Sequence, residues 1–89
     1  MSDNDNKIKH LVEQALSGNK TSMEHLIAHF YNEIFRMVYY RLPTRMDAED
    51  LTQEVFMQMT KSLPNLKDSS LFKPWLFRIA LNRVRDFHR

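Results

Sequence analysis

The sequence predicts an all-α fold, a small bundle of three to four helices. Apolar residues recur every three to four positions along most of the 89 residues, and no stretch alternates between apolar and polar residues as a strand would. The chain has one glycine and three prolines, so few positions interrupt a helix. Hydrophobic residues make up 43% of the chain, which favours a packed core in a single small domain.

Two helices are expected in the first half of the chain. The first covers residues 8–16, with Gly18 stopping it, and the polar residues 1–6 before it are predicted to be a disordered tail. The second covers residues 22–42 and ends before Pro43. Its wide apolar stripe makes it the central helix of the predicted core. The stripe consists of Met23, Leu26, Ile27, Phe30, Ile34, Met37 and Val38.

Two more helices are expected in the second half. Either Thr44 or Asp47 can cap the third helix, which ends by Leu63 because a proline follows. After a loop at residues 64–70, Ser69 or Ser70 can cap a fourth helix that continues to the end of the chain. Six residues on the packing arcs of three helices are expected to anchor the core: Phe30, Ile34, Leu51, Val55, Trp75 and Ile79.

The third predicted helix separates its two faces clearly. Its apolar arc contains Ala48, Leu51, Val55, Phe56, Met59 and Leu63, and the opposite arc contains Asp50, Gln53, Glu54 and Met57. Glu54 follows Asp50 by four residues, a like-charge spacing that costs an isolated helix about 0.2 to 0.5 kcal/mol. A basic partner would offset that cost. The alternative is an ordinary solvated face.

Charge is divided along the chain, although the net charge is only +2. Residues 1–66 contain seven Lys or Arg and nine Asp or Glu, whereas residues 67–89 contain six Lys or Arg and two Asp or Glu. On the fourth helix Arg78, Asn82, Arg85 and Arg89 fall on one narrow stripe. Guanidinium groups bind phosphates bidentately and neighbouring aromatic rings can stack on unpaired bases, so this stripe suits nucleic acid. A solvated face is again the alternative.

Two motifs resemble one family. DAEDLTQEVF followed by FKPWLFRIALNRVRDFHR is similar to region 2 of the bacterial sigma factors of the extracytoplasmic-function group, and the similarity extends upstream through ALSGN and MVYYRL to cover residues 7–89. The resemblance implies a transcription initiation factor domain that binds the clamp helices of the largest RNA polymerase subunit. It also implies recognition and melting of the minus-ten promoter element through the non-template strand, with an anti-sigma factor as a further partner.

The resemblance assigns roles to individual positions. Asp50, Gln53 and Glu54 match the positions that bind the clamp helices, and Met57 shares their face. The positions implied for promoter DNA are Asn65, Lys67, Ser69 and Ser70 in the loop, which would form a pocket for an unpaired base, and Phe72, Lys73, Trp75, Arg78, Asn82, Arg85 and Arg89. Leu81 stands where the family usually has Arg, which removes one potential phosphate contact, and Pro74 replaces a small polar residue.

Members of this group also carry a second helical domain, region 4, which binds the minus-thirty-five element. Nothing after Arg89 could form it, so we interpret the chain as an excised domain or as a family member reduced to one.

Metal binding, catalysis and membrane insertion are not expected. The chain has no cysteine, and the pair His25 and His29 has no further ligands that would complete a zinc site, so no metal or cofactor is predicted. With no glycine-rich phosphate loop and no catalytic motif, we predict that the protein is not an enzyme. No apolar run approaches a membrane span, which predicts a cytoplasmic protein.

Two alternatives to the sigma interpretation remain. One is a helical protein-interaction module without DNA binding, and the other is a helix-turn-helix reader of duplex DNA.

Overall fold

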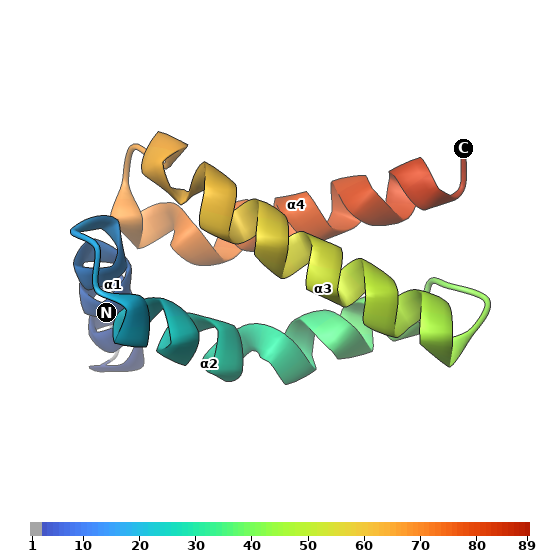
Figure 1. Ribbon diagram of the computed structural model, residues 1–89, viewed down its shortest axis with the longest axis horizontal. Helices are drawn as coiled ribbons and strands as arrows, with labels where there is room; N and C mark the ends of the chain where they lie inside the picture. The colour runs from blue at the N-terminus through green and yellow to red at the C-terminus, as the bar shows by residue number, and fades with distance from the viewer. Residues whose placement is uncertain (1–2) are drawn as a thin grey trace.

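The computed structural model describes residues 3–89 and confirms the all-α prediction. Its four helices are α1 (Asp3–Leu16), α2 (Lys20–Tyr39), α3 (Arg45–Ser62) and α4 (Phe72–Phe87), and two short 3-10 turns, η1 (Leu63–Asn65) and η2 (Ser69–Leu71), join the last two. In Figure 1, α2, α3 and α4 extend along the length of the molecule, and α1 crosses one end beside the start of α2 and of α4. No strand occurs in residues 3–89.

The first helix begins earlier than predicted. It starts at Asp3, so the expectation of a disordered tail at residues 1–6 is wrong for residues 3–6, while residues 1 and 2 lie outside the described part of the chain. Asp3 and Asp5 lie in the first turn, where acidic side chains interact favourably with the helix dipole. The end at Leu16 is as predicted, and Gly18 follows it with a positive φ of 100°, which a residue with a side chain rarely adopts.

The central helix α2 is shifted towards the N-terminus relative to its prediction. It starts at Lys20 because the side chain of Asn19 accepts a hydrogen bond from the Ser22 N–H at 3.0 Å. It ends at Tyr39 rather than at Leu42, in a turn in which the Arg41 N–H donates to the Val38 carbonyl at 3.0 Å. Pro43 then disfavours helical dihedrals at Leu42, so the helix does not resume.

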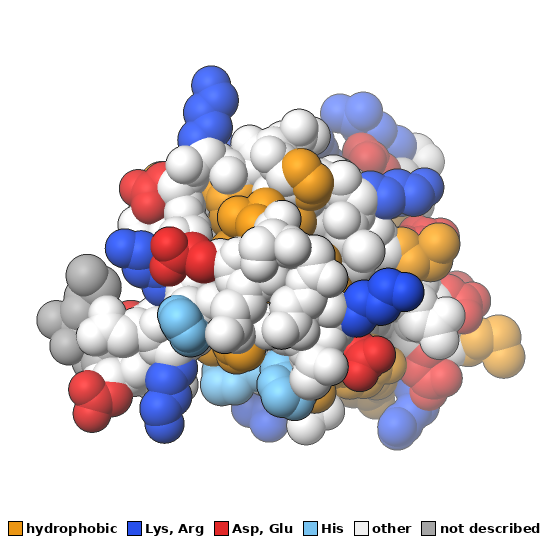
Figure 2. All heavy atoms as spheres, turned by 60° about the vertical axis from the view of Figure 1, so that its left-hand side comes forward, with side chains coloured by type: hydrophobic (Ala, Val, Ile, Leu, Met, Phe, Trp, Pro, Cys, Tyr) orange, Lys and Arg blue, Asp and Glu red, His pale blue; other side chains and the backbone are white. Residues whose placement is uncertain are grey.

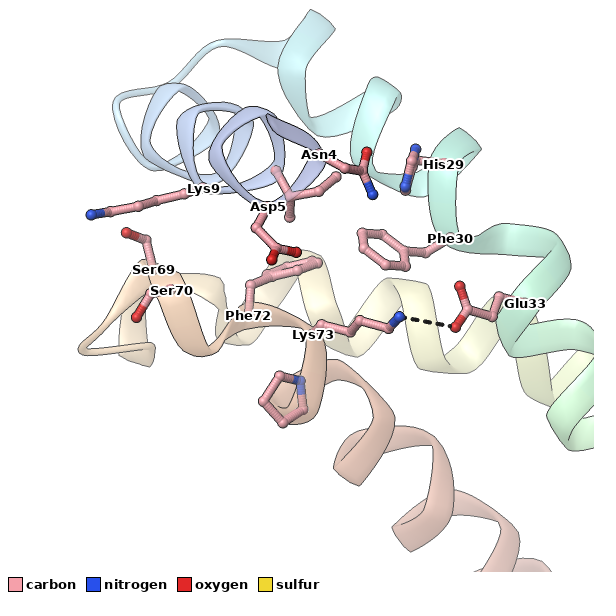
Figure 3. A pocket seen from close by; sticks show the side chains of 12 residues that line it. Asn4, Asp5, Lys9, His29, Phe30, Glu33, Ser69, Ser70, Phe72 and Lys73 are labelled. Carbon is pink, nitrogen blue, oxygen red and sulfur yellow. Dashed lines mark ion pairs between the residues drawn. The ribbon is translucent and has the colours of Figure 1, made fainter. Parts of the chain in front are cut away.

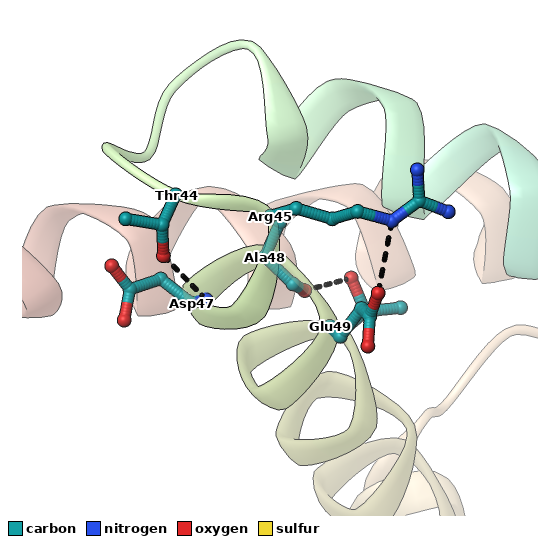
Figure 4. Close-up of polar contacts among 6 residues, drawn as sticks. Thr44, Arg45, Asp47, Ala48 and Glu49 are labelled. Atoms are coloured by element: carbon teal, nitrogen blue, oxygen red, sulfur yellow. Dashed lines mark hydrogen bonds and ion pairs between the residues drawn. The ribbon is translucent and has the colours of Figure 1, made fainter.

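Thr44 caps α3, which settles the choice between Thr44 and Asp47. The Thr44 hydroxyl oxygen accepts a hydrogen bond from the Asp47 N–H at 3.0 Å (Figure 4). Arg45, the first residue of the helix, donates from its Nε to Glu49 Oε1 at 3.0 Å. Inside the bundle, the buried Thr52 hydroxyl donates to the Ala48 carbonyl at 2.7 Å. The predicted end of this helix before Pro64 is confirmed.

The start of α4 differs from the prediction, since neither Ser69 nor Ser70 caps it. The side chain of Asp68 accepts hydrogen bonds from the Ser70 N–H at 3.0 Å and from the Ser70 hydroxyl at 2.6 Å, and thereby caps η2, from which α4 continues without a side-chain cap of its own. These two bonds lower the pKa of the Asp68 carboxyl, the hydroxyl contributing most. The cap is therefore formed at neutral pH and is lost as the pH falls through the lowered pKa.

The core lies where all four helices meet. Of the six predicted anchors, five are buried, whereas Trp75 is only half-buried at the edge and contacts the Phe72 ring, with 5.8 Å between ring centroids. Val84 is the last buried residue of α4, and Phe87, at the end of the helix, lies beyond the core and is exposed. The buried hydrophobic residues are Val12, Leu26, Phe30, Ile34, Val38, Ala48, Leu51, Val55, Phe56, Met59, Leu63, Phe72, Leu76, Ile79, Ala80 and Val84.

Candidate functional site

The outer face of α3 has the composition that the sequence predicts. All six residues of the apolar arc are buried, and Asp50, Gln53, Glu54 and Met57 are exposed on the opposite side. Met57 is 62% exposed, a high fraction for a large apolar side chain on a helix that packs so well on its other face. We call these four residues the outer face of α3. It offers acidic, amide and apolar contacts to a partner.

Glu54 has a basic neighbour within the chain, so part of its repulsion by Asp50 is offset without a partner. Arg83 extends from α4 towards α3, with its Nη1 3.8 Å from Glu54 Oε2. Its Nε donates a hydrogen bond to Gln58 Oε1 at 2.8 Å. The helical periodicity of α3 could not reveal this contact, because Arg83 belongs to another helix.

Two surface grooves flank the outer face of α3. One, of about 430 Å³, lies between α3 and α4 and is lined by Glu54, Met57, Gln58, Lys61, Ser62 and Arg83. The other, of about 330 Å³, lies between α2 and α3 and is lined by Ile27, Tyr31, Gln53, Phe56, Met57 and Thr60. Met57 lines both grooves, so its exposed side chain stands between a charged groove and a largely apolar one.

The outer flank of α4 is the second exposed polar surface. Arg78, Asn82, Arg85 and Arg89 are all exposed, as predicted. Within residues 3–89, Arg78 and Arg85 form no ion pair. The helix ends at Phe87 and does not continue to the end of the chain as predicted, so Arg89 follows it and lies 3.9 Å from the Asp86 carboxylate. We call these four residues the outer flank of α4. Two of its three guanidinium groups are therefore available to an anion.

Lys73 lies on a different side of α4 from this flank. It precedes Arg78 by five residues, which is about 140° around a helix, and its Nζ lies 3.4 Å from the Glu33 carboxylate of α2. Figure 3 shows this pair at a cavity between α1, α2 and the start of α4, with Ser69 and Ser70 near α1. The cavity has a volume of about 330 Å³ and is lined by Asn4, Asp5, Ile8, Lys9, His29, Phe30, Glu33, Ser69, Ser70, Phe72, Lys73 and Pro74. The residues implied for DNA binding are thus divided between two surfaces.

The aromatic residues implied for base stacking are less accessible than expected. Phe72 is only 1% exposed, and its ring packs between those of Phe30 and Trp75, with centroids 5.5 and 5.8 Å away. Direct stacking of a base on Phe72 would therefore require it to leave the core. Trp75 is half-buried, while Asn65 and Lys67 are exposed in the segment between α3 and α4.

The remaining surface carries mixed charge. Figure 2 shows Lys or Arg, Asp or Glu and His side chains interspersed on the end of the molecule near the N-terminus. In residues 3–89, no three His, Cys, Asp or Glu side chains are arranged to hold a metal ion. No helix in this part of the chain is both long and apolar enough to cross a membrane.

Comparison with known proteins gives a consistent result. The model of the Sigma-70 region 2 family matches residues 26–89. The chain is 30% identical over 77 residues to the ECF RNA polymerase sigma-E factor of Haemophilus influenzae and 29% identical over 76 residues to the RNA polymerase sigma-H factor of Pseudomonas aeruginosa. It is 31% identical over 81 residues to the ECF RNA polymerase sigma factor BldN of Streptomyces coelicolor.

These alignments cover 86%, 85% and 90% of this chain but 40%, 39% and 31% of the relatives, so the chain spans less than half of their length. The family match includes α3, α4 and most of α2, the helices that carry both exposed surfaces. The chain therefore belongs to the Sigma-70 region 2 family, as the region 2 domain of an extracytoplasmic-function sigma factor.

Proposed function

We propose that this domain binds core RNA polymerase through the outer face of α3 and the non-template promoter strand through the outer flank of α4. The observation that carries the proposal is the presence of two exposed surfaces of opposite character on neighbouring helices of one core. A domain that joins a basic protein surface to a nucleic acid needs both surfaces at once. The relatives compared above are RNA polymerase sigma factors, which supports the same assignment.

The polymerase half of the proposal rests on residues that the core does not need. Gln53 is exposed, and so is most of Met57, yet both lie beside the apolar groove between α2 and α3. Interfaces combine such apolar contacts with charged and amide hydrogen bonds at their margins. We assign the clamp helices of the largest polymerase subunit as the partner of this face, and an anti-sigma factor would compete for it.

The DNA half of the proposal favours the outer flank of α4 over the cavity beside Lys73. Arg78 and Arg85 form no ion pair within residues 3–89, whereas the Glu33 carboxylate already neutralises Lys73. The cavity is lined by two acidic side chains, Asp5 and Glu33, and by two basic ones, Lys9 and Lys73, so it has no excess of positive charge to attract a phosphate. We therefore propose that the single strand follows Arg78, Asn82, Arg85 and Arg89, with Asn65 and Lys67 beside the unpaired base.

Promoter melting is then a binding process in which the polymerase performs the chemistry. Extracting a base from a duplex costs a few kcal/mol, and contacts that form only with the unpaired strand offset this cost. Arginines along the flank would hold successive phosphates, and the segment between α3 and α4 would contact the base. This mechanism assigns the domain to transcription initiation in the bacterial cytoplasm.

The sharpest test replaces Gln53 and Glu54 together with Ala and measures binding to core polymerase. We expect the affinity to fall at least tenfold, because truncating one partner of a charged, hydrogen-bonded interface contact often costs about 2 to 5 kcal/mol. Circular dichroism should stay unchanged, since both side chains are exposed. Glu24→Ala, an exposed acidic residue of α2, is the matched control and should bind normally. Unchanged affinity of the double variant would refute the polymerase assignment.

Oligonucleotide binding separates the proposal from its rivals. Fluorescence anisotropy should detect salt-dependent binding that prefers the unpaired non-template strand and strengthens when polymerase is present. A protein-interaction module would show no salt-dependent binding to DNA. A helix-turn-helix reader would instead bind duplex DNA tightly on its own.

A further inference from the structure

Arg83 is the side chain that joins the two proposed binding surfaces. It follows Asn82 in the sequence, yet it points away from the outer flank of α4 and towards α3. Its Nε is held by Gln58 Oε1 at 2.8 Å, a direct and part-buried hydrogen bond, while its Nη1 is 3.8 Å from Glu54 Oε2. The guanidinium is thus fixed at one end by Gln58 and presents its other end to the Glu54 carboxylate.

The direction of the Glu54 side chain depends on its two charged neighbours. Asp50 precedes it by four residues on the same exposed face, so the two carboxylates repel each other. Arg83 attracts Glu54 towards α4 and away from Asp50. A long side chain that is already confined loses less conformational freedom when a partner binds.

The pair leaves Glu54 accessible. The Glu54 side chain is 56% exposed and that of Arg83 is 39% exposed, and both line the groove between α3 and α4. At 3.8 Å the contact is too long for a close hydrogen bond, so the carboxylate oxygens keep their capacity to accept hydrogen bonds from outside. The geometry therefore suits orientation of Glu54 better than its sequestration.

We propose that Arg83 is a positioning residue for polymerase binding, which holds the Glu54 carboxylate in the direction from which it contacts the partner. This inference rests on the proposed function of the α3 face. It extends the proposed polymerase site to a residue of α4 that is adjacent in sequence to Asn82 of the outer flank of α4. Because an exposed ion pair contributes little, removing Arg83 should weaken binding by only about threefold to fivefold.

A double-mutant cycle on core polymerase affinity tests the inference. The variants are Arg83→Ala, Glu54→Ala and the two combined, with Arg36→Ala as a matched control because Arg36 is exposed on α2 and forms no ion pair within residues 3–89. If Arg83 acts through Glu54, the combined variant should bind no more weakly than Glu54→Ala alone. The control should match the parent in the absence of DNA.

Each other result has a definite meaning. Unchanged or tighter binding of Arg83→Ala would overturn the inference, the latter by showing that Arg83 blocks Glu54. Losses that simply add in the combined variant would also overturn it, because Arg83 would then act independently or through general stability. If Glu54→Ala itself binds normally, the assignment of Glu54 under the proposed function fails, and this outcome is recognisable without any Arg83 variant.

Discussion

The outer face of α3 and the outer flank of α4 are both exposed and charged, but the chain treats their charges differently. On α3, Glu49 pairs with Arg45 at 3.0 Å and Glu54 approaches Arg83 at 3.8 Å. On α4, by contrast, Arg78 and Arg85 form no ion pair within the described residues. Glu49 and Glu54 are thus held within the protein, whereas Arg78 and Arg85 are left for another molecule. Composition alone could not distinguish charged side chains that are paired within the protein from those that are not.

The two helices also begin differently. Thr44 caps α3 directly through its hydroxyl, while α4 has no side-chain cap and continues from a 3-10 turn that Asp68 stabilises. Helix ends without a cap leave backbone N–H groups unpaired within the helix. The start of α4 therefore depends more on the burial of Phe72 than on local hydrogen bonds.

The largest effect is expected for Phe72→Ala, which tests whether burial fixes the start of α4. This side chain is 1% exposed and packs on Phe30, so its removal should lower the free energy of unfolding by about 3 to 5 kcal/mol. So small a domain would then be largely unfolded. Thermal denaturation followed by circular dichroism provides the measurement, with the half-exposed Leu81→Ala as a control that should change stability little. A parent-like melting temperature for Phe72→Ala would contradict the packing.

A smaller effect, on binding alone, is expected when Arg78 and Arg85 are both replaced by Ala. Single-stranded oligonucleotides should bind about tenfold more weakly at low salt, and the slope of log affinity against log salt should flatten by about 1.4, since each phosphate contact contributes about 0.7. Stability should change by less than about 0.5 kcal/mol because both side chains are exposed. Anisotropy across a salt series measures this, in holoenzyme if the isolated domain binds too weakly. An unchanged slope would mean that the flank is only a solvated surface.

The smallest effect concerns the cap of α3. Thr44→Ala removes the acceptor of the Asp47 N–H bond and should cost about 1 kcal/mol. Thr44→Ser keeps an oxygen at the same place and should stay close to the parent. Urea denaturation of the three proteins measures the difference. Equal stabilities for the alanine variant and the parent would show that α3, like α4, is held at its start by packing rather than by its cap.

Much of the fold was predictable because apolar periodicity reports directly on burial. The buried arc of α3, the stripe of α2 and the exposed stripe of α4 all follow from residue spacing within one helix. The ends were harder to predict. Asp3 extends α1 with polar residues that have no apolar pattern, and the cap at Asp68 acts on a 3-10 turn rather than on the helix that follows.

The parts of the candidate site that were not predictable depend on contacts between helices. A helical wheel puts Arg83 on the packing arc of α4 but cannot show that its head group meets Gln58 and Glu54. Nor could the sequence show that Lys73 would pair with Glu33 of α2, on the other side of α4 from Arg78. Long, charged side chains reach several ångströms from their own helix, so their partners are set by the tertiary arrangement.

The crossing of α1 over the end of the bundle has a consequence for the order of folding. Contacts between α1 and α2, between α2 and α3 and between α3 and α4 all join consecutive helices, and such contacts form quickly because little chain must be closed into a loop. In addition, α1 contacts η2, a turn that lies in the last quarter of the sequence. That contact closes a long loop, so we expect α1 to pair with α2 early and its contact with η2 to form last.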